Sequence, residues 1–430
     1  MKKLILFSLA VFFSYTLLAN SVSVDIAEKA AQNYYAAMYK SIKKQAPNQI
    51  TLDLAFNYSL SEKLQPNNGN KTESILFYVF NVNEDDGFVI ISAEDRVYPI
   101  IGYSLEGNFT GENLPPALDY LLDQYAHEIN YVITEKTATS IKVKSSWSNI
   151  LKGHISNNFK SISAVDPLVS TTWDQGTYYN ELCPYDNTYN QLTVTGCVAT
   201  AMAQIMKFWN YPETGTSYHS YNTNSYGTLS ANFGAETYDW GSMPNSLNGS
   251  SNAVATLMFH CGVAVEMSYG VGATGGSSAY VIEAYSPTQY CAEYAYKNFF
   301  GYKNSTLGVV RENYDEATWI QMLKTDLDAG RPIQYAGFGS GGGHTWVCDG
   351  YDNNNLFHMN WGWSGSFDGY YSVNELTPGI GGAGGGSGSF TDGQQALFGI
   401  EPANGGGGGG GAQFDLRAYS EISINPNPIN

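Results

Sequence analysis

The chain has 430 residues, with 21 basic against 39 acidic side chains and a formal net charge of −18. So acidic a chain is a poor partner for a phosphate backbone, which excludes nucleic-acid binding. Its five cysteines are too few for a disulfide-stapled scaffold, and no pair has the C-x-x-C spacing of a zinc site.

The first nineteen residues have the pattern of a secretory signal peptide. Lys2 and Lys3 precede an apolar run over 4–18, and Ala19 is followed by polar residues. A membrane-spanning helix needs about 18–25 apolar residues, and this run is shorter. We therefore expect residues 1–19 to be a signal peptide, no membrane span in the rest of the chain, and a secreted, extracellular protein.

Charge divides the rest of the chain into two modules. Residues 1–164 carry 14 basic and 16 acidic side chains, whereas residues 165–403 carry 6 and 21. This asymmetry suggests two domains with different roles. In the first domain, 20–164, hydrophobic periodicity predicts helices at 27–41 and 115–134 and strands at 75–82 and 87–92. Its Lys-, Ser- and Asn-rich end, 136–164, predicts an exposed and cleavable connector.

The second domain, 165–402, has helix patterns first and strand patterns later. This order predicts an α+β fold with a helical part and an antiparallel sheet. Glycine-rich sequence predicts a mobile loop at 379–388 and a flexible linker at 403–412, and residues 413–430 look like the start of a C-terminal extension. The helices are expected at 197–209, 288–300 and 315–329, and the strands at 333–337, 344–351, 356–363 and 369–373.

Cys197 is the strongest candidate for a nucleophile. It follows Gly196, which allows a sharp turn, and it begins an almost uncharged helix that runs to Trp209. A thiol at a helix N-terminus lies at the positive end of the macrodipole, which favours the thiolate. The free N–H groups of that turn can also stabilise an oxyanion. The alternative is that Cys197 is an ordinary buried cysteine.

His344 is the best candidate for the base that would serve this thiol. It follows three glycines that let a substrate strand approach, and it leads a predicted strand. Asn360 lies on the next predicted strand, where its amide could accept the imidazole N–H and fix the productive tautomer. Trp361 could shield that bond from water. The alternative is that Asn360 is an ordinary strand amide and Trp361 an ordinary core residue.

These segments resemble the streptopain family of papain-like cysteine proteases. The nucleophile segment of that family is similar to Thr195–Pro212, its histidine segment to Gly343-His344, and its tryptophan segment to His358-Met-Asn-Trp-Gly-Trp-Ser-Gly. More weakly, the segment 87–103 resembles the inhibitory prodomain of the family. The resemblance implies an α+β prodomain followed by a papain-like catalytic domain.

The same resemblance assigns roles residue by residue. Cys197 matches the nucleophile, His344 the general base and acid, and Asn360 the residue that orients the histidine. Gln175, in Thr172-Trp-Asp-Gln-Gly, matches the glutamine that completes the oxyanion hole. The residues matched to substrate binding are Gly343, Ser277, Ser278, Trp361 and Trp363.

The sequence thus predicts a secreted cysteine endopeptidase made as a zymogen that matures by proteolytic removal of its prodomain. Its expected partners are protein and peptide substrates, with an apolar residue preferred at the second position before the cut, and its own prodomain as inhibitor. No metal and no organic cofactor is expected, because His219, His260 and His358 have no ligands at metal spacing. Two alternatives stay open: a secreted acyl transferase with the same Cys–His pair, and a non-enzymatic secreted binding protein.

Overall fold

The computed structural model describes residues 21–47, 49–59, 74–155, 164–339, 342–374, 376 and 393–404. The predicted signal peptide, the glycine-rich loop at 379–388, nearly all of the linker at 403–412 and the extension at 413–430 lie outside these residues. Within the described ranges, no helix is both long and apolar enough to cross a membrane.

The N-terminal module forms the helices and strands that its sequence predicts, together with two strands that it does not. Helix α1 begins after Ser23, whose hydroxyl accepts the N–H of Ile26, and it buries an alanine and tyrosine face. Strands β1 and β4 complete a four-stranded antiparallel sheet. The elements are α1 (Val24–Lys43), β1 (Leu52–Ser59), β2 (Ile75–Val82), β3 (Phe88–Ser92), β4 (Ile100–Ser104) and α2 (Pro116–Thr134).

The prediction of an exposed connector over 136–164 is wrong for its first half. Residues Ile141–Leu151 form helix α3, capped by Ser140. Trp147 is buried and donates its indole N–H to the carbonyl of Val97 at 2.9 Å. The apolar residues Val143, Trp147 and Ile150 are four and three positions apart, a helical spacing hidden among lysines and serines.

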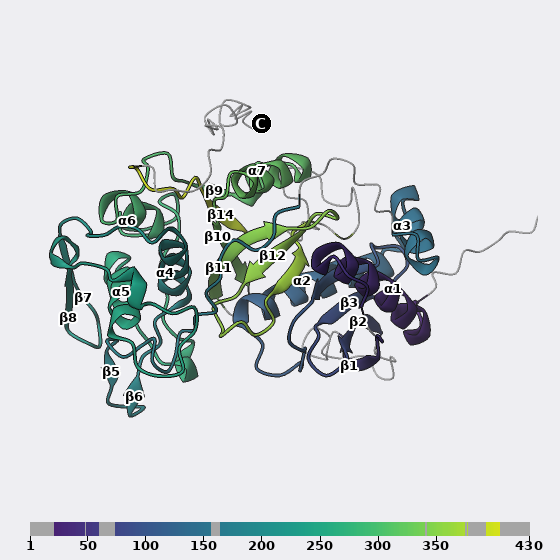
Figure 1. Cartoon of the computed structure of the whole chain (residues 1–430), viewed down its shortest axis with the longest axis horizontal. Coiled ribbons are helices and arrows are strands. Elements are labelled where there is room, and N and C mark those ends of the chain that lie inside the picture. Colours follow the sequence, from purple (N-terminus) through teal and green to yellow (C-terminus); the bar gives the residue numbers. More distant parts are fainter. Residues whose placement is uncertain are drawn as a thin grey trace, which may run out of the picture.

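The second module has a helical lobe and a sheet, as predicted. The lobe contains α4, α5 and α6 with two small hairpins. Figure 1 shows the lobe on one side of the strands of the second module and the N-terminal module on the other side. Helix α5, strands β9 and β14 and both hairpins were not predicted, although α5 is almost entirely apolar and is capped by Ser251. The lobe elements are β5 (Tyr185–Asp186), β6 (Gln191–Leu192), α4 (Cys197–Trp209), β7 (Tyr218–Asn222), β8 (Thr228–Asn232), α5 (Asn252–Ala264) and α6 (Ala292–Asn298).

The sheet elements follow, with helix α7 packed against them. Strand β12 ends at Asn360, three residues earlier than predicted, because the Trp361 N–H turns to the Asp368 carboxylate and Gly362 takes a positive φ of 71°. The elements are β9 (Leu307–Val310), α7 (Glu316–Asp328), β10 (Ile333–Gly339), β11 (Gly342–Tyr351), β12 (Leu356–Asn360), β13 (Gly369–Ser372) and β14 (Gln395–Phe398).

One antiparallel sheet of ten strands runs through both modules in the order β1-β2-β3-β4-β13-β12-β11-β10-β14-β9. The junction is the pairing of β4 with β13, where Tyr103 lies opposite Tyr370. Their rings stack with centroids 5.0 Å apart. Edge strand β13 of the second module is therefore covered by the first module.

The two modules also share a hydrophobic core. One buried cluster joins α2 of the first module to Trp319, Trp346 and Trp361 of the second. The hydroxyl of Tyr125 on α2 donates to the carbonyl of Ser372 in β13. Because burial of apolar area is the main stabilising term in association, the first module is a firmly docked part of this fold.

Candidate active site

The sharp turn before Cys197 is formed as the sequence predicts. Gly196 is the N-cap of α4 with φ of 88°, a conformation that disfavours any side chain. A Cβ at this position would lie 2.8 Å from the thioether of Met267 and 3.1 Å from the Cβ of Ser277. The segments that carry these two residues therefore pack directly against the start of the helix, where Cys197 is half-buried.

The thiol is not activated in this arrangement. Burial raises the pKa of Cys197, and backbone hydrogen bonds from Thr345, Val198 and Cys197 itself act against that shift without reversing it. The expected stabilisation of the thiolate by the helix start is therefore present but outweighed by desolvation. The contact with Thr345 also places β11 beside the thiol.

The segment that carries Gln175 lies beside the start of α4. The carbonyl of Gln175 accepts the N–H of Thr195 at 3.0 Å, two residues before the nucleophile. Among the described residues, its side-chain amide has no hydrogen-bond partner, so it is available to a substrate. The structure thus brings Cys197 and the Gln175 segment together.

His344 lies on the other face of the sheet from Cys197. Side chains alternate along a strand, so His344 shares a face with Trp346 and Cys348, which pack in the core that includes α2. Val347, on the opposite face, packs with α4. Opposite His344 in the register is Gly337, where a Cβ would meet the ring of Tyr120 from α2.

The expected thiolate–imidazolium pair is therefore absent from this arrangement of the described residues. Burial lowers the pKa of His344, and no part of that shift comes from Cys197. Likewise, none of the shift of the thiol comes from His344. Each group is desolvated without the other's charge, which raises the pKa of the Cys197 thiol and lowers the pKa of the His344 imidazole.

The predicted role of Asn360 is not formed either. In the pairing of β11 with β12 it lies opposite Val347, three residues from His344. Its Oδ1 accepts from Gln204 at 2.9 Å and from the N–H of Gly362 at 3.1 Å. Its Nδ2 donates to the carbonyl of Thr171 at 2.7 Å. Within the described part of the chain, no hydrogen bond joins it to His344.

Two of the predicted substrate contacts are buried with the N-terminal module docked. Trp361 is 2 % exposed and donates its indole N–H to the carbonyl of Phe367 at 3.0 Å. Ser277 is buried, and its hydroxyl bonds the carbonyl of Val194 and the backbone of Gly270.

The other three predicted contacts remain accessible. Ser278 and Gly343 are exposed, and Trp363 is half-buried at the edge of the shared core. Ser278 forms an isolated backbone bridge with Ser268, which ties the end of the 275–278 loop to the segment before it.

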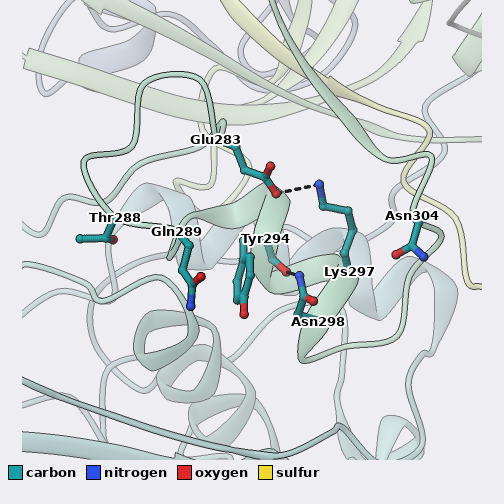
Figure 2. A pocket seen from close by; sticks show the side chains of 7 residues that line it. All are labelled: Glu283, Thr288, Gln289, Tyr294, Lys297, Asn298 and Asn304. Atoms are coloured by element: carbon teal, nitrogen blue, oxygen red, sulfur yellow. Dashed lines mark hydrogen bonds and ion pairs between the residues drawn. The ribbon is translucent and has the colours of Figure 1, made fainter.

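A hollow in the helical lobe is separate from these residues. It has a volume of about 470 Å³ and is lined by polar side chains around α6, where Lys297 pairs with Glu283 at 2.7 Å (Figure 2). It contains no nucleophile. Among the described residues, no cluster of His, Cys, Asp and Glu is arranged to hold a metal ion.

The fold and the placement of Cys197 are those expected of a papain-like cysteine peptidase with a second module docked on its sheet. The helical lobe supplies a cysteine at a helix start, and the antiparallel sheet supplies the histidine strand. The N-terminal module covers the sheet face on which that histidine lies.

Comparisons with known proteins agree with this class. Residues 173–371 match the model of the peptidase C10 family, and residues 19–129 match that of the Spi protease inhibitor. Streptopain of Streptococcus pyogenes is 30 % identical over 366 residues, which cover 78 % of this chain and 83 % of streptopain. The chain belongs to the peptidase C10, or streptopain, family of cysteine peptidases.

Two further relatives extend the comparison. The thiol protease/hemagglutinin PrtT of Porphyromonas gingivalis is 32 % identical over 396 residues, which cover 90 % of this chain but only 42 % of PrtT. The chain therefore spans less than half the length of that relative. A fragment of Prevotella intermedia prointerpain A, solved as a cysteine-to-alanine mutant, has a similar fold, with a TM-score of 0.64 and 30 % identity over 82 % of this chain and 99 % of the fragment.

Proposed function

We propose that the chain is a secreted cysteine endopeptidase made as a zymogen, with Cys197 as its nucleophile. The observation that carries this proposal is the half-buried thiol at the start of α4, held beside the Gln175 segment and the backbone of Thr345. The cysteine N–H and the Gln175 amide would form the oxyanion hole. Removing one such donor costs about 2.7–4 kcal/mol in a serine protease.

In the proposed mechanism, the thiolate attacks a peptide carbonyl and His344 protonates the departing amine. Water then attacks the acyl-enzyme and releases the second product, with His344 as the general base. This chemistry needs His344 on the Cys197 side of β11. Since α2 covers the opposite face and contacts the strand beside His344, undocking of the prodomain would free the strand to rearrange.

Maturation would remove the prodomain by a cut after α3. That helix is anchored through Trp147 to Val97 and through Asn33, whose amide donates to the carbonyl of Ile150 at 2.8 Å. The proposed cut therefore falls in the second half of the connector, between Lys152 and Ala164, most of which lies outside the described residues. Mass spectrometry of the purified protein over time would locate the cut.

Substrates would bind as extended strands along Gly343 and Ser278. Val194 is partly exposed where it faces Gly276, and it would offer an apolar wall. An aliphatic or aromatic residue at the second position before the cut gains burial there, about 1.5–3 kcal/mol for a fully buried side chain. A peptide library whose products are dominated by Arg, Lys or Asp at that position would contradict this assignment.

The principal test is Cys197→Ala. We expect a folded protein that hydrolyses no casein and stays uncleaved at the connector when purified alone. The wild-type protein should be labelled at Cys197 by an epoxide thiol inhibitor, which a pure binding protein would not be. Casein mixed with an amine donor separates the transferase alternative, because a transferase incorporates the amine instead of releasing peptides.

Secretion is the remaining part of the proposal, and the N-terminal sequence supports it. N-terminal sequencing of protein from the culture medium should begin at or after Asn20. Retention of residues 1–19 in the exported protein would contradict a cleaved signal peptide.

A further inference from the structure

A closed ring of hydrogen bonds lies behind the candidate nucleophile and includes a residue that the sequence gives no role. Gln204 is on α4, seven residues after Cys197, so the two lie about two turns apart on the same side of the helix. Its side chain is completely buried in a helix that is otherwise nearly all apolar. A buried amide is unfavourable unless its polar atoms are paired.

Both ends of this amide are paired. Its Oε1 accepts the hydroxyl of Thr171 at 2.9 Å and the N–H of Trp173 at 3.2 Å. Its Nε2 donates to Oδ1 of Asn360 at 2.9 Å. The Asn360 Nδ2 closes the ring by donating to the carbonyl of Thr171 at 2.7 Å.

The ring connects the segments that form the candidate site. Trp173 is two residues before Gln175, so the Gln204 amide fixes the chain that carries the oxyanion glutamine relative to the helix that carries the thiol. Functional donors must be held to within about 0.5 Å of the productive geometry. The Gln204 amide acts together with the bond from the Thr195 N–H to the Gln175 carbonyl, which also ties this segment to the start of the helix.

The ring also accounts for Asn360. Its Oδ1 has two lone pairs, which face Gln204 and the N–H of Gly362. In this arrangement the asparagine supports the ring rather than the imidazole of His344.

We propose that Gln204 is the positioning residue of the oxyanion hole. It touches no substrate; it holds the Gln175 segment and Asn360 at fixed positions relative to Cys197. This inference rests on the roles proposed above for Cys197 and Gln175. It predicts that loss of Gln204 weakens stabilisation of the tetrahedral intermediate and leaves the reactivity of the thiol unchanged.

The test compares the mature wild-type enzyme with Gln204→Met, which keeps the size of the side chain and removes all three of its bonds. The full-length variants are matured by tagged wild-type enzyme that is then removed. We expect kcat on a peptide substrate to fall about 10–100-fold, which is no more than the loss of an oxyanion donor itself causes. KM should stay within about twofold of the wild-type value. Affinity for a peptide aldehyde, which forms a tetrahedral adduct, should fall by the same factor.

A second readout separates positioning from general damage. The rate at which iodoacetamide alkylates Cys197 needs no oxyanion hole, so it should stay within about twofold of the wild-type rate. The double variant Gln175→Ala/Gln204→Met should lose no more activity than Gln175→Ala, because two residues that act as one unit are not additive. An equal fall in alkylation, or losses that multiply, would overturn the proposal.

Two further variants keep the test decisive. Gln334→Met removes a buried amide of β10 that has no side-chain partner among the described residues, so it controls for loss of an amide as such and should leave the aldehyde affinity unchanged. If Gln204→Met does not fold, Thr171→Val removes one bond of the ring and must give the same pattern with a smaller loss. A wild-type enzyme that neither cleaves casein nor reacts with the epoxide would instead refute the proposed function.

Discussion

The carboxylate of Asp352 anchors the prodomain, and removing its two prodomain donors should weaken docking measurably. Asp352 follows β11 and is buried. Its Oδ2 accepts the hydroxyls of Tyr34 at 3.2 Å and Tyr103 at 3.3 Å, both from the N-terminal module. Within its own module it accepts three more bonds, from the backbone N–H and side-chain amide of Asn354 and from the N–H of Leu356.

The expected magnitude follows from these distances. A hydrogen bond to a charged group contributes about 1.5–3 kcal/mol. Both O–H bonds are longer than the usual 2.5–3.0 Å, and the three remaining donors still satisfy the carboxylate, so each is worth about 1–1.5 kcal/mol. Tyr34→Phe also removes the bond that Asn354 Nδ2 donates to the Tyr34 hydroxyl at 3.0 Å, about 0.5–1.5 kcal/mol. Tyr34→Phe with Tyr103→Phe should therefore raise the dissociation constant of the prodomain about 70–2,000-fold.

The assay uses a complex nicked at the connector. Cys197→Ala zymogen is cut in trans by active enzyme, and dissociation of the prodomain is followed by surface plasmon resonance. Tyr39→Phe is the matched control, because that ring lies on α1 and its hydroxyl bonds only the exposed Gln45 among the described residues. Unchanged affinity in the double variant at neutral pH would refute the reasoning.

The pH dependence of docking has a definite sign. Burial raises the pKa of Asp352 above its ordinary value of 3.8, and the Tyr34 hydroxyl is among the bonds that oppose this shift. The bond from Tyr34 favours the ionised carboxylate, so its contribution to docking is present above the pKa of Asp352 in the docked state and is lost as the pH falls through that pKa. The effect of the double variant should accordingly be largest where Asp352 is ionised and shrink as the pH falls.

Three other expectations follow from the geometry. Asn360→Ala should reduce turnover much less than His344→Ala, because only His344 transfers a proton; equal losses in folded variants would contradict this. The affinity of the prodomain should change little between 0.05 and 0.5 M salt, because the contacts that the two modules share are mainly apolar. A change in affinity of about 30-fold over this range would contradict that expectation. Gly196→Ala should lower the free energy of unfolding by about 1–3 kcal/mol because of the positive φ. Gly227 lies at an open turn with a similar φ, so Gly227→Ala measures the backbone effect alone. Equal losses in the free energy of unfolding of the two glycine variants would show that the packing of Met267 at Gly196 is unimportant.

The local elements of this fold were largely predictable because their signals are local. Helix α4 begins and ends at the residues that the sequence predicts, Cys197 and Trp209, since glycine and the apolar run fix it. The β2 strand likewise matches its hydrophobic run. Helix α3 was missed because three apolar residues among lysines and serines are a weak signal until a surface exists for them to pack on.

By itself, the sequence determined the two-module plan, the family and the identity of Cys197, His344 and Gln175 as candidates, because motif spacing and charge are properties of the chain. Only the tertiary structure decided which of these groups meet. The face of β11 on which His344 lies depends on its register with β10 and on the docked helix α2. The partners of Asn360 depend on a helix 156 residues earlier in the chain. Amide pairing between distant segments is set by their packing in the folded protein, and no local pattern encodes it.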